Sequence, residues 1–142
     1  CALVFYRAVH EGAADHYTPE QRAAWAPKRP EAHAFAERFT SEHCFVAEEA
    51  RTIQGFMSLQ ESGHLSMAFV GPEHRGTGLA AQLYDSILAQ ARLLGLTTLD
   101  TQASRLARPF FARRGWQVVA EEEVIRHGVP IPRTLMKLAL SG

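Results

Sequence analysis

The stretch that most constrains the fold of this chain is residues 69–88, FVGPEHRGTGLAAQLYDSIL. An apolar segment leads through a proline and an Arg-Gly-Thr-Gly turn directly into an amphipathic helix. The helix is predicted because apolar residues recur every three or four positions, which places them on one face, and Gly95 follows as a natural C-terminal cap. These apolar residues are Ala80, Leu83, Tyr84, Ile87, Leu88, Ala91 and Leu94. A strand that turns directly into a long helix is typical of an α/β domain.

The sequence before this stretch changes from a helical to a strand pattern. Residues 2–10 are apolar enough to form a packed helix, and residues 18–21, TPEQ, match the capping box of a short second helix. A third helix carries Phe35 and Phe39, four positions apart on one face. Three strands then follow, of which the first two form an antiparallel pair; they are predicted at 43–49, 53–60 and 64–70.

The sequence after the long helix alternates strands with one short helix. Pro109 lacks the amide that a helix interior needs, so the helix within residues 104–115 is expected to begin later than Ser104. Three further strands are predicted at 97–102, 116–125 and 134–140, the last two linked by the Gly/Pro-rich segment RHGVPIP at 126–132. We therefore predict one α/β domain over residues 1–142, with a mixed central sheet flanked by helices.

The balance of charges excludes several kinds of partner. Fifteen basic residues match fifteen acidic ones in short alternating runs, whereas a general nucleic-acid or anionic-membrane surface needs a basic excess. No apolar run approaches the roughly 18 residues of a membrane span. Cys44 lies in an apolar alternating segment, which is typical of a buried thiol rather than of a disulfide with Cys1. We expect a cytoplasmic protein that binds neither nucleic acid nor membrane, and the sequence leaves a homodimer open.

The turn at residues 75–80 has the composition of an anion-binding loop. The first amides of a helix are unpaired and carry the positive end of the helix dipole, so they attract phosphate oxygens. Gly76 and Gly78 allow the backbone to approach a ligand closely, and Arg75 adds a charge. The alternative is a plain strand-to-helix connection that needs glycine for its dihedral angles. The two familiar phosphate-binding patterns, Gly-x-x-x-x-Gly-Lys-Ser/Thr and Gly-x-Gly-x-x-Gly, are absent.

A wider pattern around this turn resembles a known family. The run V-x-P-x-x-R-G-T-G-L-A at 70–80 resembles the acyl-CoA loop of the GNAT superfamily of N-acyltransferases, with Arg75, Gly78 and Ala80 at its signature positions. After the next strand, Ser-x-x-Ala-x-x-Phe-Phe-x-x-x-Gly-Trp at 104–116 is similar to the family's second CoA-side block, Asn-x-x-Ala-x-x-x-Tyr-x-x-x-Gly-Phe. The resemblance covers residues 45–140.

The resemblance implies a fold and a cosubstrate. Acetyl-CoA would lie where two parallel strands, 64–70 and 97–102, splay apart, with its pantetheine arm along the backbone of the first strand. The residues that the resemblance assigns to the cosubstrate are Ala68, Phe69 and Val70 at the pantetheine, Arg75, Gly76, Thr77, Gly78, Leu79 and Ala80 at the pyrophosphate, and Ser104, Phe110 and Phe111 in the second block. The two phenylalanines also fit a packed core. The family opens with a strand before the first helix, whereas this sequence begins within the helical pattern, so we expect either that the strand precedes Cys1 or that the sheet lacks it.

Acyl transfer to an amine needs a proton acceptor and can use a proton donor for the leaving thiolate, and the residues that usually serve as base and as acid are missing. Family members often use an acidic residue early in the strand before the loop and a Tyr in the second block, but here these positions carry His64 and Ser66, and Phe111. His64 is the better candidate base because an imidazole titrates near neutrality; the alternative is a structural histidine that hydrogen-bonds its neighbours. The other catalytic candidates are Glu61, Tyr17 and Tyr84, the last of which fits the core by its helical spacing.

The acceptor is expected to be an amine of a small molecule or a peptide. Two segments form the expected walls of its site, EGAADHYTPEQRAAWAP at 11–27 and RHGVPIP at 126–132. Acidic Glu11 and Asp15 beside Tyr17 and Trp25 would suit a cationic amine, whereas Arg126 would suit a carboxylate. The spacing of the seven histidines predicts no metal site.

Three functions are compatible with this sequence. The first is an N-acetyltransferase that moves an acetyl group from acetyl-CoA to an amine. The second is a catalytically silent acyl-CoA-binding sensor, which Phe111 and the absent strand carboxylate favour. The third is a partner-binding α/β domain without CoA, and a melting temperature that CoA leaves unchanged would indicate it.

Overall fold

The computed structural model describes residues 1–37, 39–49, 51–71 and 78–140, and the predicted helices and strands are present in the predicted order. The helices are α1 (Ala2–Arg7), which continues as the π-helical turn η1 (Ala8–Gly12), α2 (Pro19–Trp25), α3 (Ala32–Glu37), α4 (Leu79–Leu93) and α5 (Arg108–Ala112). The strands are β1 (Glu42–Glu49), β2 (Thr52–Gln60), β3 (His64–Val70), β4 (Thr98–Ala103), β5 (Gln117–Arg126) and β6 (Val129–Ala139).

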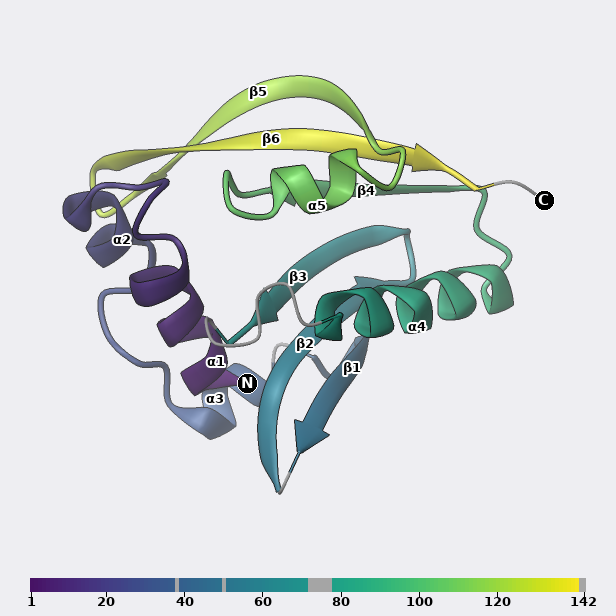
Figure 1. The fold of residues 1–142 in the computed structure, drawn as a ribbon, viewed down its shortest axis with the longest axis horizontal. Helices are drawn as coiled ribbons and strands as arrows, with labels where there is room; N and C mark the ends of the chain where they lie inside the picture. Colours follow the sequence, from purple (N-terminus) through teal and green to yellow (C-terminus); the bar gives the residue numbers. More distant parts are fainter. Residues whose placement is uncertain (38, 50, 72–77, 141–142) are drawn as a thin grey trace.

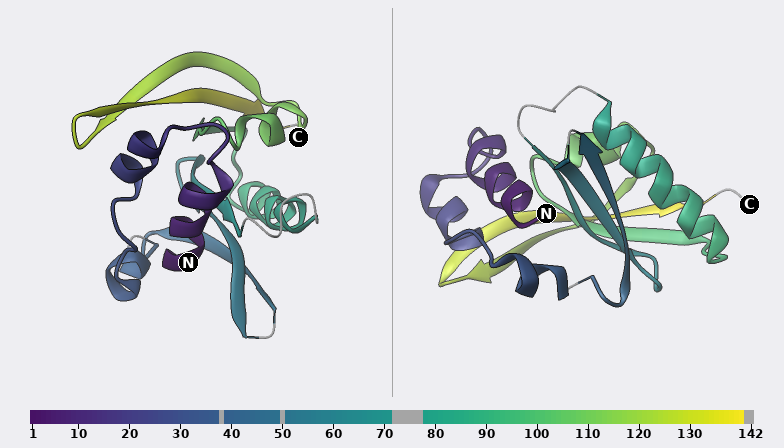
Figure 2. Two further views of the ribbon diagram at one scale, coloured as in Figure 1. Left: turned by 60° about the vertical axis from the view of Figure 1, so that its left-hand side comes forward. Right: turned by 90° about the horizontal axis from the view of Figure 1, so that it is seen from below.

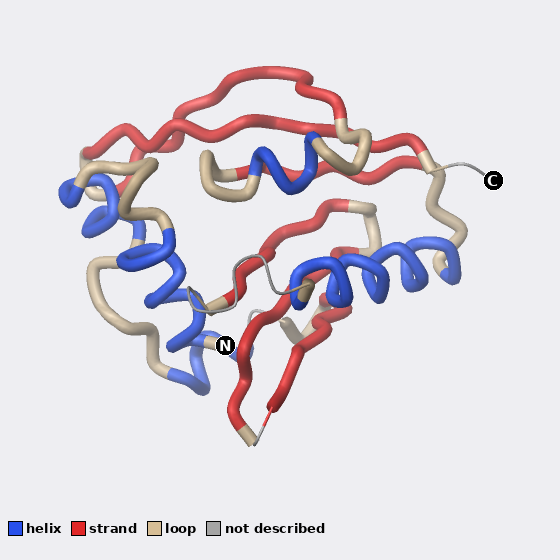
Figure 3. Tube along the Cα trace, viewed as in Figure 1, coloured by secondary structure: helices blue, strands red, loops and turns tan. Residues whose placement is uncertain are grey.

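The strands form one mixed sheet. Their order is β1-β2-β3-β4-β6-β5, and Figure 3 shows them in red with the blue helices around them. β3 and β4 are parallel, and the other neighbouring pairs are antiparallel. Figure 1 shows that β1–β3 and β4–β6 diverge as two halves of this sheet. The predicted α/β fold, with a mixed sheet whose parallel strands splay, is therefore confirmed.

Alternation along β2 separates the core into two faces. Met57 and Leu59 pack in the cluster that contains the apolar face of α4, with Leu83, Tyr84 and Ile87. Phe56 points to the other face and packs with α1 and α3, because successive side chains of a strand project to opposite sides. Figure 2 shows α4 on one side of the sheet and α1–α3 on the other.

The C-terminal end of α4 follows the sequence prediction. Gly95 has a φ of 74°, in the left-handed region that favours glycine. Its amide donates to the carbonyl of Arg92 at 3.0 Å, and the amide of Leu96 donates to that of Ala91 at 3.0 Å. This pair of bonds is a Schellman motif, which satisfies carbonyls that the helix end would otherwise leave unpaired.

The N-terminal helices are held by a capping box and by aromatic contacts. The Thr18 side chain accepts from the amide of Gln21 at 3.1 Å, and the Gln21 side chain accepts from the amide of Thr18 at 3.0 Å, so the capping box is confirmed. Phe35 contacts Phe39, with ring centroids 5.6 Å apart, although α3 ends at Glu37 and Phe39 lies outside it.

The segment predicted as a linker at 126–132 is mostly strand, and that prediction is wrong. β5 reaches Arg126 and β6 begins at Val129, so only His127 and Gly128 form the turn. The prolines are tolerated because β4 pairs with β6 only from Thr134 onward. On the side that faces away from β5, the carbonyls of Pro130 and Pro132 accept from Gln21 Nε2 at 3.2 Å and from Tyr17 Oη at 2.8 Å.

Candidate functional site

The parallel pairing of β3 with β4 ends almost as soon as it begins. The strands pair at His64 with Asp100 and at Leu65 with Thr101, and at no later position among their described residues. At that point the hydroxyl of Thr101 donates to the carbonyl of Leu65 at 2.7 Å, in place of a backbone amide. The rest of β3, residues 66–70, therefore faces β4 across a gap, with backbone groups available for a ligand.

A β-bulge lies at the start of this gap. Ser58 of β2 pairs with Met67 and Leu59 pairs with Leu65, so Ser66 is an extra residue on β3. A bulge interrupts the strict alternation of side chains. Consequently the consecutive residues Ser66 and Met67 both line the same cavity. Bulges of this kind are common beside functional sites because they redirect a side chain.

One cavity, of about 630 Å³, lies between β3, α4 and α5 and is called here the α4-side cavity. Most of the residues predicted to bind the cosubstrate line it; they are Ala68, Phe69, Val70, Gly78, Ala80, Ser104, Phe110 and Phe111. Leu79 begins α4 but does not line the cavity, and the predicted Arg75, Gly76 and Thr77 lie outside the described residues. The fold therefore brings predicted cosubstrate residues from four separate segments of the chain together around one cavity.

The start of α4 faces the α4-side cavity with amides that have no acceptor within the helix. Gly78 caps the helix with a φ of 87°, and the first intrahelical bond runs from the amide of Gln82 to the carbonyl of Gly78 at 3.1 Å. The amides of Leu79, Ala80 and Ala81 therefore have no intrahelical acceptor, and the first turn has no acidic side chain. The left-handed φ shows that Gly78 also has a backbone reason to be glycine.

Besides Phe69 of β3 and His16, the aromatic and basic side chains that line this cavity come from α5 and the two residues after it. Arg113 and Arg114 line it, and the Arg114 guanidinium lies 3.6 Å from the centre of the Phe110 ring. Phe111 is 1% exposed and packs on Trp116 at 5.0 Å. Phe111 has no proton to donate, so a Tyr-type acid is absent from its position.

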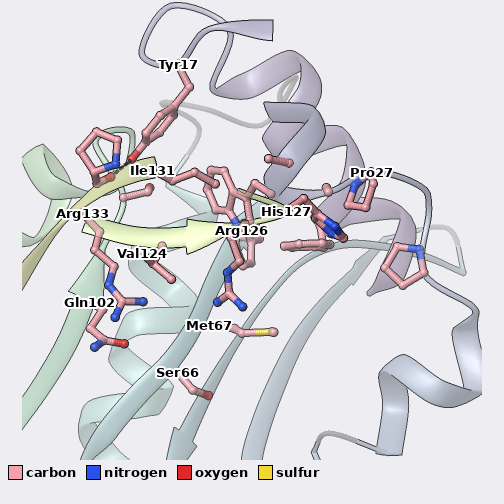
Figure 4. A pocket seen from close by; sticks show the side chains of 18 of the residues that line it. Tyr17, Pro27, Ser66, Met67, Gln102, Val124, Arg126, His127, Ile131 and Arg133 are labelled. Atoms are coloured by element: carbon pink, nitrogen blue, oxygen red, sulfur yellow. Dashed lines mark hydrogen bonds between the residues drawn. The ribbon is translucent and has the colours of Figure 1, made fainter. Parts of the chain in front are cut away.

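A second cavity, of about 500 Å³, lies between α1, α2, β3 and the β5–β6 hairpin and is called here the α2-side cavity. Figure 4 shows the side chains that line it. Its walls combine aromatic and basic groups; they include Phe5, Tyr17, Trp25 and Phe69, and Lys28, Arg126, His127 and Arg133. Phe69 and Ser104 line both cavities. The two cavities therefore meet at the gap between β3 and β4.

Tyr17 lines the α2-side cavity but its hydroxyl is already occupied. It donates to the carbonyl of Pro132 and accepts from the amide of Arg105, each at 2.8 Å. Burial raises the pKa of Tyr17 above its ordinary value. The geometry gives this residue a structural role, because its bonds hold the loop before α2 against β6 and the segment after β4.

The other predicted catalytic residues lie away from both cavities. His64 is at the paired end of β3, where its Nδ1 donates to Asp100 Oδ1 at 2.5 Å. Glu61 is exposed in the β2–β3 turn, 3.9 Å from His43 Nε2. Tyr84 is in the α4 core and accepts from Trp116 Nε1 at 2.8 Å, as its spacing predicted. None of these three residues lines either of the two cavities that meet at the gap between β3 and β4.

The expected acceptor walls are divided between the two cavities. Tyr17, Trp25, Arg126 and His127 line the α2-side cavity, and His16 lines the other. The acidic residues of the first wall lie elsewhere: Glu11 pairs with Arg7 at 3.1 Å, and Asp15 lines neither cavity. The acidic environment considered for a cationic amine is therefore missing from the α2-side cavity.

A hydrogen-bonded group at the bulge was not predicted from the sequence. The Ser66 hydroxyl donates to Glu42 Oε1 of β1, and the hydroxyls of Ser58 and Ser66 lie 2.8 Å apart. Because Ser66 uses its single proton toward Glu42, Ser58 must be the donor in the second bond, and Ser66 Oγ keeps one lone pair. The sequence shows that side chains alternate between the two faces of each strand. It does not show which side chains of β1, β2 and β3 lie next to one another, so this group could not be predicted from it.

The fold, a mixed sheet whose parallel strands splay between flanking helices, is that of the GNAT acetyltransferases, and comparison with known proteins agrees. The family model of the acetyltransferase (GNAT) domain matches residues 13–140, and the chain therefore belongs to the GNAT family. It is 33% identical over 124 residues to a protein of Escherichia coli K12 named the uncharacterized N-acetyltransferase YafP, covering 87% of this chain and 77% of that protein.

Solved structures show the same fold. A GCN5-related N-acetyltransferase of Rhodopseudomonas palustris is 29% identical with a TM-score of 0.91, over 98% of this chain and 87% of that one. The yncA protein of Salmonella typhimurium, solved with acetyl-CoA, is 18% identical with a TM-score of 0.69, over 99% of this chain and 87% of that one.

The described residues include neither a helix fit to span a membrane nor a cluster of metal-ligating side chains. Within 1–37, 39–49, 51–71 and 78–140, no helix has the length and apolar character needed to cross a membrane. The same ranges contain no group of three His, Cys, Asp or Glu side chains placed to hold a metal ion.

Proposed function

We propose that this chain transfers an acetyl group from acetyl-CoA to an amine of a small molecule or peptide, and that the two substrates meet at the gap between β3 and β4. The observation that carries the proposal is the short pairing of these strands, which ends at Leu65 and Thr101. Beyond it, two cavities on different sides share Phe69 and Ser104. One cavity can hold the acyl donor while the other presents the acceptor to it.

The α4-side cavity suits acetyl-CoA. The pantetheine arm would pair with those backbone groups of Ala68, Phe69 and Val70 that face β4, as an added strand does at a sheet edge. The pyrophosphate would lie at the unpaired amides that begin α4, together with the predicted Arg75, Gly76 and Thr77. The acetyl-CoA in the yncA structure supports this choice of cosubstrate.

Ser66 and Glu42 can accept the proton of the acceptor. An ammonium group must lose a proton before its nitrogen attacks the thioester carbonyl. Ser66 Oγ can take that proton through its free lone pair while its own proton passes to the Glu42 carboxylate. The new C–N bond then forms, the C–S bond breaks, and the CoA thiolate takes a proton from water because Phe111 has none to give.

The test combines CoA binding with thiol release. Acetyl-CoA should raise the melting temperature, and a panel of primary amines should include acceptors that release free CoA thiol above the rate of hydrolysis. A melting temperature that rises without turnover on any amine would indicate the acyl-CoA-binding sensor. A melting temperature that acetyl-CoA leaves unchanged would contradict the proposed function altogether.

A further inference from the structure

The ionisable side chains that line the α2-side cavity are mostly basic, although two carboxylates lie just behind its walls, Glu122 at 3.4 Å from Arg133 and Glu42 bonded to Ser66. Its ionisable lining side chains, besides Tyr17, are Lys28, Arg126, His127 and Arg133. No Asp or Glu is among its described lining residues. An anionic group would be attracted to this basic lining.

Two of these cations face the cavity from one surface of the β5–β6 hairpin. Val124 pairs with Ile131, and Arg126 and Arg133 lie two positions further along their strands. Directly paired residues share a face, as do residues two apart, so both arginines project to the same side as Val124 and Ile131. Figure 4 shows their guanidinium groups turned into the cavity, toward Gln102 and Met67.

The two arginines have capacity left for a ligand. Arg126 is exposed, and no hydrogen bond or ion pair joins its side chain to another described residue. Arg133 Nε lies 3.4 Å from Glu122 Oε1 but makes no hydrogen bond with a described residue. A guanidinium group offers five donors in a planar fork that matches a carboxylate. A single carboxylate between them would satisfy donors on both.

We infer that the acceptor is an amino acid-like molecule, whose carboxylate Arg126 and Arg133 bind while its amine faces Ser66. This inference rests on the proposed function. The remaining walls, Phe5, Trp25, Val124 and Ile131, suit an apolar or aromatic side chain.

The anionic groups of the cosubstrate do not account for these arginines. The phosphates of CoA have their own cationic surroundings at the start of α4, where Arg113 and Arg114 line the other cavity. Arg126 and Arg133 are on the opposite side of the shared residues Phe69 and Ser104. Loss of Arg126 is therefore expected to change acceptor selection and to leave CoA affinity unchanged.

The test compares phenylalanine with 2-phenylethylamine, which differ by the carboxylate. The natural enzyme should use phenylalanine with a kcat/KM at least about tenfold higher, which corresponds to about 1.4 kcal/mol. Arg126→Gln should abolish that preference by raising KM for phenylalanine alone. Arg92→Gln, an exposed change on α4 outside both cavities, is the matched control and should keep the preference. Equal use of both amines, or a preference that survives Arg126→Gln, would overturn the inference.

A binding experiment distinguishes failure of the proposed acetyltransferase function from failure of the inferred carboxylate site. If no amine is acetylated, binding of N-acetylphenylalanine and of N-acetyl-2-phenylethylamine to the CoA complex is measured by calorimetry. Tighter binding of the carboxylate, lost in Arg126→Gln, would support the anion site in a protein that is not an acetyltransferase. Equal binding of the two, or none of either, would overturn the inference independently of catalysis.

Discussion

Ser66 is a small residue whose importance comes from its neighbours. The bulge places it on the floor of the α2-side cavity, and its hydroxyl joins Glu42 to Ser58 across three strands. Ser58 is fully buried, so its hydroxyl depends on Ser66 as acceptor. A buried polar network of this kind is costly when it is only partly satisfied, which gives the group a structural value beside its proposed chemistry.

Glu42→Gln tests the proposed proton path at this residue. The amide cannot accept the proton that the carboxylate takes, so kcat is expected to fall about 100-fold or more, with CoA affinity unchanged. Stopped-flow or steady-state thiol release measures the effect. Glu48→Gln, an exposed change on the same strand, is the control and should retain full activity.

The same assay separates Glu42 from the predicted base His64. A His64→Ala variant that retains its turnover would be consistent with a structural role for the hydrogen bond between His64 and Asp100. If His64→Ala instead loses turnover together with the acidic limb of the pH–rate profile, while Glu42→Gln remains active, the histidine is the base.

Tyr84 gives the fold a predictable response to alkaline pH. Burial raises the pKa of its hydroxyl above the ordinary value of 10.0, and the bond from Trp116 only partly offsets this. In the unfolded chain the phenol ionises near pH 10, so the unfolded state loses its proton first as pH rises. The stability contribution is complete below about pH 10 and is lost as pH rises through the folded-state pKa.

Tyr84→Phe should flatten the alkaline part of this response. Urea unfolding between pH 8 and pH 11, roughly one unit or more on each side of the phenol's pKa, measures it for both proteins. At neutral pH the variant should be about 1–3 kcal/mol less stable, because Trp116 Nε1 loses its buried acceptor. An identical loss of stability at high pH in both proteins would show that Tyr84 is not responsible.

Among the helices and strands, α4 carries the proposed pyrophosphate site at its first turn, and this site can be tested by substitutions that do not disturb the helix. Ala81 lies in the first turn and lines the α4-side cavity, whereas the adjacent exposed Gln82 does not. Both positions tolerate an acidic side chain, which stabilises a helix N-terminus by about 0.3–1 kcal/mol. Gly78 is a poorer target, because its left-handed φ makes any side chain strained whatever it does to ligand binding.

Ala81→Glu should weaken CoA binding about tenfold or more and leave the melting temperature equal or higher. The new carboxylate repels the pyrophosphate that the helix start is proposed to hold. Gln82→Glu adds the same charge one residue away and should reduce affinity much less. Calorimetric titration with CoA measures both; equal affinities in the two variants would place the pyrophosphate elsewhere.

For the whole molecule, ligand binding should complete the sheet. The backbone amides of residues 66–70 that face β4 lack partners there, so in the free protein they should exchange hydrogen rapidly. Acetyl-CoA should slow their exchange because its pantetheine arm pairs with them. Hydrogen exchange with and without acetyl-CoA measures this, and α4 amides near Ile87, already within a helix, serve as the internal control.

The sequence by itself determined the local elements and the family. Periodicity identified α4 and its core face, the capping box at Thr18, the cap at Gly95 and the bounds of β3, because each depends on residues a few positions apart. The loop and second-block patterns identified residues that surround one cavity. The strand from Val129 was missed because its prolines are acceptable only where a neighbouring strand is absent.

Only the tertiary structure decided which side chains meet. Glu42 and Ser66 are 24 positions apart, and Tyr17 and Pro132 are 115 apart. Their contacts depend on strand register and on a bulge, and a shift of one residue would reverse every facing side chain. The same reason applies to Arg126 and Arg133, which share a cavity because a two-residue turn sets the register of β5 and β6. The helices and strands could be predicted because they depend on residues close together in the sequence. The site could not, because it depends on the register between strands that are distant in the sequence.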